Sequence, residues 1–212
     1  MRKMILIMLI VIVECCYLSN RIVPVFIEKI DLKLKKNEIA IVNLYFNKNK
    51  GMLIKTNDTN ILLLLDLNDK DKLLSNLDDF NIKVDYLLSY YDYDIPCHYK
   101  KILDDELKIK EIGIYSNNDN IIVNYQNHNF CILNDSYIDN FNKCHYIYWD
   151  NPSDEIETNY EPELILYQKL NEEFLEKTYD KWIDTYYVDP TYYTILKLNS
   201  SSYNVINIPI KG

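Results

Sequence analysis

Glycine is almost missing from this sequence. The 212 residues include three glycines, and alanine occurs once, as Ala40. Phosphate-binding loops, dinucleotide-binding fingerprints and the Gly-x-Ser-x-Gly turn of serine hydrolases all need glycines at fixed spacing. None of these patterns is present. The sequence therefore excludes the usual nucleotide-binding loops and offers no good candidate for a catalytic nucleophile.

Positive charge is also scarce. The chain has 23 Lys and Arg against 32 Asp and Glu, which gives a formal net charge of −9. Proteins that bind nucleic acid usually carry a basic patch or stripe, whereas the short lysine clusters Lys33–Lys36 and Lys100–Lys101 are flanked by acids. We therefore expect no binding to nucleic acid. The 20 tyrosines accompany abundant Asn, Ile and Lys, as an AT-rich coding sequence would produce.

Long apolar runs are missing after the N-terminus. Met4–Val13 is an uncharged run of ten residues that follows Arg2 and Lys3. It is shorter than the roughly 20 residues that span a bilayer, but it has the pattern of a secretory signal peptide. We expect a signal peptide at 1–19 and a single domain at 20–212, secreted or in the lumen of the secretory pathway, without stable membrane insertion. An uncleaved first strand or anchor is the alternative.

If the chain is secreted, its cysteines are exposed to an oxidising environment. Cys15 and Cys16 lie at the expected cleavage region, which leaves Cys97, Cys131 and Cys144 in the mature chain. Because thiols in secreted proteins tend to oxidise, a Cys131–Cys144 disulfide with a free Cys97 is one prediction. A zinc site is the alternative, although no pair has the usual ligand spacing. Its histidines would be those near the cysteines, namely His98, His128 and His145.

Two further features concern the surface. Three sequons, at Asn57, Asn134 and Asn199, predict a glycoprotein if the chain is secreted. The tyrosine pairs at 186–187 and 192–193 either cover an edge of the core or form an exposed aromatic patch for a partner.

Apolar periodicity predicts alternating strands and helices. Leu73, Leu74 and Leu77 form a stripe at helical spacing, so a helix is expected at Asp69–Phe80. Two more helices are expected at Cys97–Leu107 and Asn171–Tyr186. Early strands followed by mixed β/α units favour a layered α/β domain. The expected strands are Arg21–Leu32, Glu38–Phe46, Gly51–Lys55, Asn60–Asp66, Val84–Leu88, Glu111–Tyr115, Ile121–Tyr125, Phe130–Leu133, His145–Trp149, Leu164–Tyr167, Tyr193–Leu198 and Asn204–Pro209.

The segment Leu87–Leu103 carries the most informative motif. An apolar strand runs into Ser89 and is followed by carboxylates at alternate positions, Asp92 and Asp94. This segment resembles the metallo-β-lactamase motif Ser-His-x-Asp-x-Asp-His, whose side chains hold one or two metal ions. Tyr90 and Ile95 stand where that motif has its two histidines.

The order of segments over about 38–209 resembles the metallo-β-lactamase domain of ComEC-type DNA-uptake channels. Asp66 matches the aspartate of that family's Asp-Thr-Gly strand end, and Asp135 matches its metal-bridging aspartate. Asp150 and Asn151 replace its histidine pair. The resemblance implies an α/β fold, a reduced four-layer αββα sandwich. It also implies a degenerate site, which we name the strand-end site, consisting of Asp66, Ser89, Tyr90, Asp92, Asp94, Asp135, Asp150 and Asn151.

The ligand chemistry of this site decides the expected function. Zinc prefers imidazole and thiolate ligands, whereas the matched positions keep only carboxylates and no histidine. We therefore expect no zinc hydrolysis and no cofactor, and interpret the chain as an inactive scaffold that binds a protein partner. The alternative is a phosphodiesterase-like hydrolase with Mg²⁺ or Mn²⁺ on Asp92, Asp94 and Asp135. A third alternative is an unrelated secreted β-rich protein.

Overall fold

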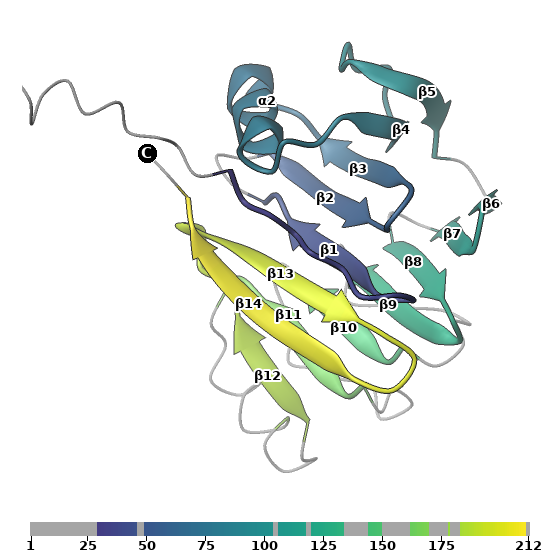
Figure 1. Ribbon diagram of the computed structural model, residues 1–212, viewed down its shortest axis with the longest axis vertical. Coiled ribbons are helices and arrows are strands. Elements are labelled where there is room, and N and C mark those ends of the chain that lie inside the picture. Colours follow the sequence, from purple (N-terminus) through teal and green to yellow (C-terminus); the bar gives the residue numbers. More distant parts are fainter. Residues whose placement is uncertain are drawn as a thin grey trace, which may run out of the picture.

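The fold consists of two β-sheets stacked as layers, as the ribbon in Figure 1 shows. This is a computed structural model, and it describes residues 29–45, 49–103, 106–117, 120–133, 144–149, 162–169, 178 and 183–210. The predicted signal peptide and the sequon at Asn134 lie outside the described residues. Among the described residues, no helix combines the length and the apolar composition needed to cross a membrane.

The first sheet has the strand order β14-β13-β1-β2-β3-β4-β5. From β14 to β3 neighbouring strands are antiparallel, and β3, β4 and β5 are parallel. Its strands are β1 (Ile39–Asn43), β2 (Lys50–Lys55), β3 (Asn60–Asp66), β4 (Val84–Ser89), β5 (Cys97–Ile102), β13 (Tyr192–Leu198) and β14 (Tyr203–Pro209).

The second sheet has the order β12-β11-β10-β9-β8-β7-β6. Here β6 to β9 form an antiparallel meander, and β9 to β12 are parallel. Its strands are β6 (Glu106–Ile109), β7 (Ile112–Asn117), β8 (Asn120–Tyr125), β9 (His128–Leu133), β10 (Tyr146–Trp149), β11 (Leu164–Tyr167) and β12 (Asp184–Tyr187).

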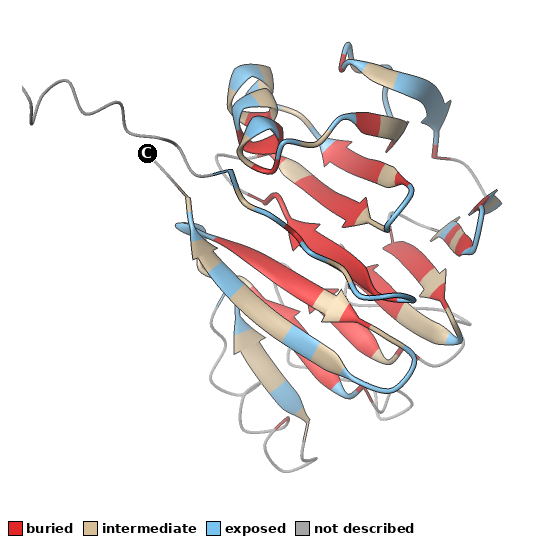
Figure 2. Ribbon diagram, in the orientation of Figure 1, coloured by how far each residue is buried: buried red, intermediate tan, exposed pale blue. Residues whose placement is uncertain are grey.

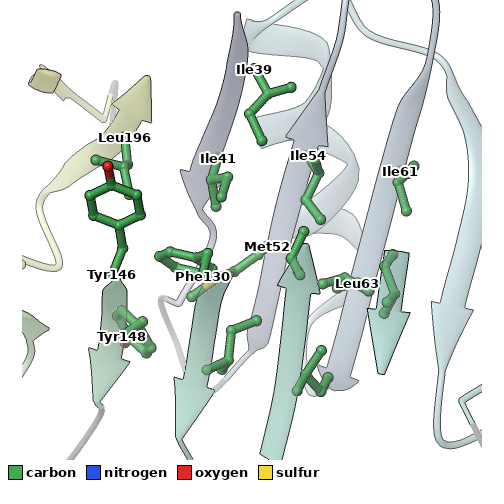
Figure 3. Packing of buried hydrophobic residues seen from close by; sticks show 14 of the residues in the cluster. Ile39, Ile41, Met52, Ile54, Ile61, Leu63, Phe130, Tyr146, Tyr148 and Leu196 are labelled. Carbon is green, nitrogen blue, oxygen red and sulfur yellow. The ribbon is translucent and has the colours of Figure 1, made fainter. Parts of the chain in front are cut away.

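The main core lies between the two sheets. Because successive strand residues face opposite sides, Ile39 and Ile41 of β1 point toward the second sheet, where they join a cluster that includes Phe130 and Tyr148. Figure 3 shows these side chains meeting between the strands. Burial is continuous along the central strands (Figure 2). The edge strand β5 is exposed after its first residue, and the edge strand β14 varies between intermediate and exposed. Strands that are buried on both faces have unbroken apolar runs in their sequences.

The outer face of the first sheet is covered by helix α2 (Lys70–Asp79). Asp69 caps its N-terminus, since its carboxylate accepts a hydrogen bond from the Lys72 backbone N–H at 2.9 Å. Leu73, Leu77 and Phe80 pack against the sheet. The predicted helix Asp69–Phe80 is therefore confirmed.

The expected four-layer αββα sandwich is wrong. The described residues are mostly strands in two mixed sheets, with α2 as the one helix whose bounds are described. The predicted helix Cys97–Leu107 is replaced by β5 and the start of β6. Strand pairing overrides local propensity here, because β5 runs in register beside β4 and Tyr99 stacks on Tyr86 with ring centroids 5.1 Å apart.

Two other predicted elements also need correction. The helix expected at Asn171–Tyr186 is wrong at its C-terminal end, where Asp184–Tyr187 is strand β12 and pairs with β11. Most of the remaining predicted helix lies outside the described residues. Of the strand expected at Arg21–Leu32, the described residues 29–32 are not in a strand.

The tight turns are built without glycine. Five residues with described backbones have positive φ, and none of them is glycine: Asn37, Asn81, Lys110, Gln126 and Asn127. Asparagine tolerates this left-handed conformation better than most residues do. The turns at Asn37 and Lys110 line one cavity, although they lie far apart in the sequence.

Candidate functional site

Two residues of the strand-end site lie at neighbouring strand ends. Asp66 is the last residue of β3, Ser89 is the last residue of β4, and Leu64 of β3 pairs with Ser89. Because β3 and β4 are parallel, their carboxyl ends share one edge of the sheet, where functional groups of open sheets usually collect. Asp135, Asp150 and Asn151 lie outside the described residues.

Ser89 anchors the loop that follows β4. Its side chain is buried, and its hydroxyl donates a hydrogen bond of 2.6 Å to the Tyr91 carbonyl. Its own carbonyl accepts a hydrogen bond of 2.8 Å from the Leu103 N–H, just after β5. Both contacts fix the chain path, so the geometry assigns Ser89 a structural role.

Tyr90 and Ile95, which stand where the motif that this segment resembles has histidines, both pack against neighbouring side chains. The Tyr90 hydroxyl is 2.9 Å from the Ser116 hydroxyl of β7, a contact that joins the first sheet to the second. The Tyr90 ring also packs against the main core. Ile95 is 3% exposed and packs with the α2 side of the first sheet. Neither side chain is arranged as a metal ligand.

The two loop carboxylates are each paired with a different lysine. Asp92 accepts a hydrogen bond of 2.9 Å from Lys100 of β5, and Asp94 accepts one of 2.8 Å from Lys70 of α2. The bond from Lys70 lowers the pKa of Asp94, and the bond to Asp92 raises the pKa of Lys100. These ion pairs are solvent-exposed, so they contribute little stability.

The local backbone explains why these carboxylates do not converge. The Tyr93 N–H donates to the Tyr91 carbonyl and the Ile95 N–H donates to the Tyr93 carbonyl. Asp92 and Asp94 therefore each occupy the centre of a three-residue turn. This loop of residues 90–96 returns the chain to the start of β5 without a helix, although parallel crossovers usually take a dozen residues or more.

The described part of the site does not fit a zinc ion. Asp66 accepts a hydrogen bond of 3.1 Å from the Asn68 side chain. Burial and then the charge of Asp66 raise the pKa of Tyr93, which keeps that phenol neutral. Within the described ranges, no three His, Cys, Asp or Glu side chains are grouped closely enough to hold a metal. The donor set lacks imidazole and thiolate, the ligands that zinc prefers.

The cysteine and histidine residues form different contacts from those of a zinc site. Cys131 and Cys144 are disulfide-bonded, which confirms that pairing, and Cys97 is free. His98 lies 3.1 Å from the Asp85 carboxylate, and His145 accepts a hydrogen bond from the Asn129 N–H. The disulfide uses two of the three cysteine sulfurs that the zinc alternative offered as ligands.

Among the described residues, three tyrosines donate hydrogen bonds to carboxylates, a feature that the sequence did not reveal. Tyr146 of β10 donates to Glu163 at 3.3 Å, and Tyr193 of β13 donates to Asp79 at 2.7 Å. Burial, followed by the nearby carboxylate charge, raises the pKa of Tyr146 to about 12. Burial and the Asp79 hydrogen bond raise the pKa of Tyr193 further. The third pair is Tyr203 and Asp184.

These pairs predict a loss of stability at alkaline pH. A tyrosine in the unfolded chain has a pKa near 10, whereas that of folded Tyr146 is about 12. The stabilisation is therefore fully present below about pH 10 and is lost as the pH rises from there through about 12. Urea unfolding at pH 8, 9, 10 and 11 should show the decline, and Tyr146→Phe should reduce it. The exposed Tyr192→Phe is the control; an equal effect of both variants would contradict the assignment.

Comparison with known proteins defines the class of fold. The two stacked mixed sheets resemble the metallo-β-lactamase fold of a solved structure. One solved structure that shows this likeness is that of the metallo-β-lactamase fold protein YhfI from Bacillus subtilis, at a TM-score of 0.51 and 10% identity. The alignment covers 75% of this chain and 99% of that chain. No protein-family model and no curated protein sequence matches this chain. At this identity the likeness shows the fold alone.

Proposed function

We propose that this chain is a secreted, catalytically inactive metallo-β-lactamase-like protein that binds a protein partner. The main observation behind this proposal is the role of Tyr90 and Ile95, which stand at the two positions where the motif has histidines. Tyr90 bridges the two sheets and Ile95 is buried beside α2, so the positions that would hold a metal serve packing instead. The segment order also favours descent from a ComEC-type domain.

The disulfide supports an oxidising compartment. Cys131 and Cys144 are both fully buried and bonded to each other. Disulfides of this kind persist in secreted proteins and are rare in the cytosol. Two of the three sequons lie in described turns, at Asn57 between β2 and β3 and at Asn199 between β13 and β14, where an enzyme of the secretory pathway can reach them.

The partner surface that we propose lies along β5. This strand is the last in its sheet, and its free edge offers backbone groups for strand addition. Tyr99 is 63% exposed and Ile102 is 56% exposed. Tyr91, in the loop beside it, is 64% exposed. Exposed apolar side chains at an open sheet edge are typical of an interaction site.

A metal and activity assay tests the inactive assignment. Purified protein should hold substoichiometric zinc by elemental analysis and should not hydrolyse bis(p-nitrophenyl) phosphate in Mn²⁺ or Mg²⁺ above the buffer rate. The physical reason is that Asp92 and Asp94 are each paired with a lysine, and that Tyr90 and Ile95 stand where the motif has histidines. An active metallo-β-lactamase-fold hydrolase serves as the positive control.

The competing outcome is a hydrolase that uses a hard cation. Turnover in Mn²⁺ that is abolished in both Asp92→Ala and Asp135→Ala, and retained in the exposed control Asp71→Ala, would overturn the proposal. Stoichiometric zinc with turnover would overturn it as well.

A further inference from the structure

An apolar cavity lies on the face of the first sheet that helix α2 covers, between α2 and the start of β5, both labelled in Figure 1. It has a volume of about 480 Å³. Most of the side chains that line it are apolar, namely Leu74, Leu77, Ile82, Val84 and Pro96. Leu74 and Ile82 are only half-buried, and Pro96 is exposed. The described residues therefore cover this apolar surface incompletely.

The chain before β1 already packs along the same face of the sheet. Residues 29–35, which we name the strap, are in neither a helix nor a strand. Ile30, Leu32 and Leu34 are buried or half-buried and join the cluster that contains α2, whereas the residues at 29, 31, 33 and 35 are exposed. Such alternation is typical of an extended chain that lies on an apolar surface.

The N-terminal end of the strap is held at the rim of the cavity. The Lys29 ammonium donates a hydrogen bond of 2.8 Å to the carboxylate of Asp78, a residue that lines the cavity. The Ile30 N–H donates a hydrogen bond of 2.7 Å to the Asp79 carbonyl at the end of α2. The residues that precede Lys29 are therefore joined to the described structure beside the cavity.

The segment that precedes the strap is strongly apolar. Residues 21–27 include no acidic residue and five large apolar ones: Ile22, Val23, Val25, Phe26 and Ile27. They lie outside the described residues and belong to the domain expected at 20–212. Seven extended residues span roughly 23 Å at about 3.3 Å per residue, which is enough to cross the cavity.

We propose that residues 21–27 continue the strap and cover the apolar cavity between α2 and β5. Contact between the two apolar surfaces removes both of them from water, which is favourable. The segment has an advantage over a separate ligand, because its attachment through Lys29 gives it a high effective concentration at the cavity. In an extended chain, alternate residues face the same side, so Phe26 should face the sheet as Ile30 does.

The free thiol of Cys97 tests whether the cavity is covered, because Cys97 is one of the lining residues. The full chain is used with Cys15 and Cys16 replaced by serine. A maleimide should label Cys97 slowly in this background. The double variant Val25→Ser/Phe26→Ser should speed the labelling at least tenfold, because it removes most of the apolar surface that would cover the thiol. The urea unfolding midpoint of each protein shows that labelling is compared between folded chains.

A pair of lysine variants tests the attachment at the rim. Lys29→Ala removes the ion pair with Asp78 and should speed the labelling of Cys97 a few-fold, since an exposed ion pair contributes modestly. Lys33→Ala removes the same charge from the exposed ion pair with Asp31 and should leave the rate unchanged. Equal rates in these two variants, or labelling of the serine background as fast as in urea, would overturn the proposal.

A disulfide trap tests where the segment lies. In the serine background, Phe26→Cys should form a disulfide with Cys97 of the same chain under mild oxidation, which peptide mass spectrometry detects. Ser200→Cys, in the exposed loop between β13 and β14, is the control and should not pair with Cys97. Pairing at Phe26→Cys that is no faster than at Ser200→Cys contradicts the proposal. Disulfides between two chains contradict it in favour of a second copy in the cavity.

Discussion

Phe130→Ala should lower the free energy of unfolding by about 3–5 kcal/mol, the usual cost of deleting a buried aromatic side chain. Phe130 is 1% exposed and lies between the two sheets, among residues of both (Figure 3). Neighbouring strands hold it in place, because it pairs with Val123 of β8 and Tyr146 of β10. The cavity left behind would be lined by rigid strands, which relax little. Urea unfolding followed by circular dichroism measures the loss.

The control for this prediction is Tyr192→Ala, which truncates an aromatic side chain that is 37% exposed. Its cost should stay below about 1 kcal/mol, as surface substitutions usually do. If Phe130→Ala cost no more than this control, the two sheets would not share the core described above.

The Cys131→Ala/Cys144→Ala double variant should lose about 3 kcal/mol of stability, because the disulfide closes a loop of moderate length in the unfolded chain. The two cysteines are 13 residues apart in sequence and are both fully buried. Reduction of the wild-type protein under denaturing conditions should give the same change. Urea unfolding with and without reductant measures both effects.

Cys97→Ala serves as the matched control, because Cys97 is a free, half-buried thiol on the edge strand β5. It should change the stability much less than the double variant does, and reductant should not alter that change. Equal stability of oxidised and reduced wild type would show that the disulfide does not stabilise the fold.

Local patterns in the sequence predicted several elements well. The apolar run that ends at Asp66 is strand β3 with the expected bounds. The leucine stripe preceded by Asp69 is helix α2, and the segments around Asn127 form the β8–β9 hairpin. These signals lie within about ten neighbouring residues, where hydrophobic periodicity and capping chemistry act directly.

Elements that depend on distant partners were predicted poorly. Cys97–Leu107 has no local feature that distinguishes an edge strand from an amphipathic helix, and only its pairing with β4 makes Cys97–Ile102 a strand. The same holds for Asp184–Tyr187, which is a strand because it pairs with β11. The four-layer expectation failed because it counted these segments as helices.

The strand-end site was located by motif, whereas its present chemistry depends on tertiary contacts. The sequence by itself predicts that Asp66 and Ser89 lie at strand ends, and it has Tyr90 and Ile95 where the motif that it resembles has histidines. Only the folded chain brings Lys70 to Asp94, Lys100 to Asp92 and Ser116 to Tyr90.

The cavity lined by the turns at 36–38, 56–59 and 109–112 could not be predicted from the sequence, because these turns are far apart along the chain. Composition and local patterning determined the acidic charge, the apolar strands, the missing metal ligands and the candidate disulfide. Tertiary structure alone decided which strands pair and which carboxylates meet a lysine. The physical reason is that hydrogen-bond pairing between strands and charge pairing between side chains act through space, across residues that the sequence does not place side by side.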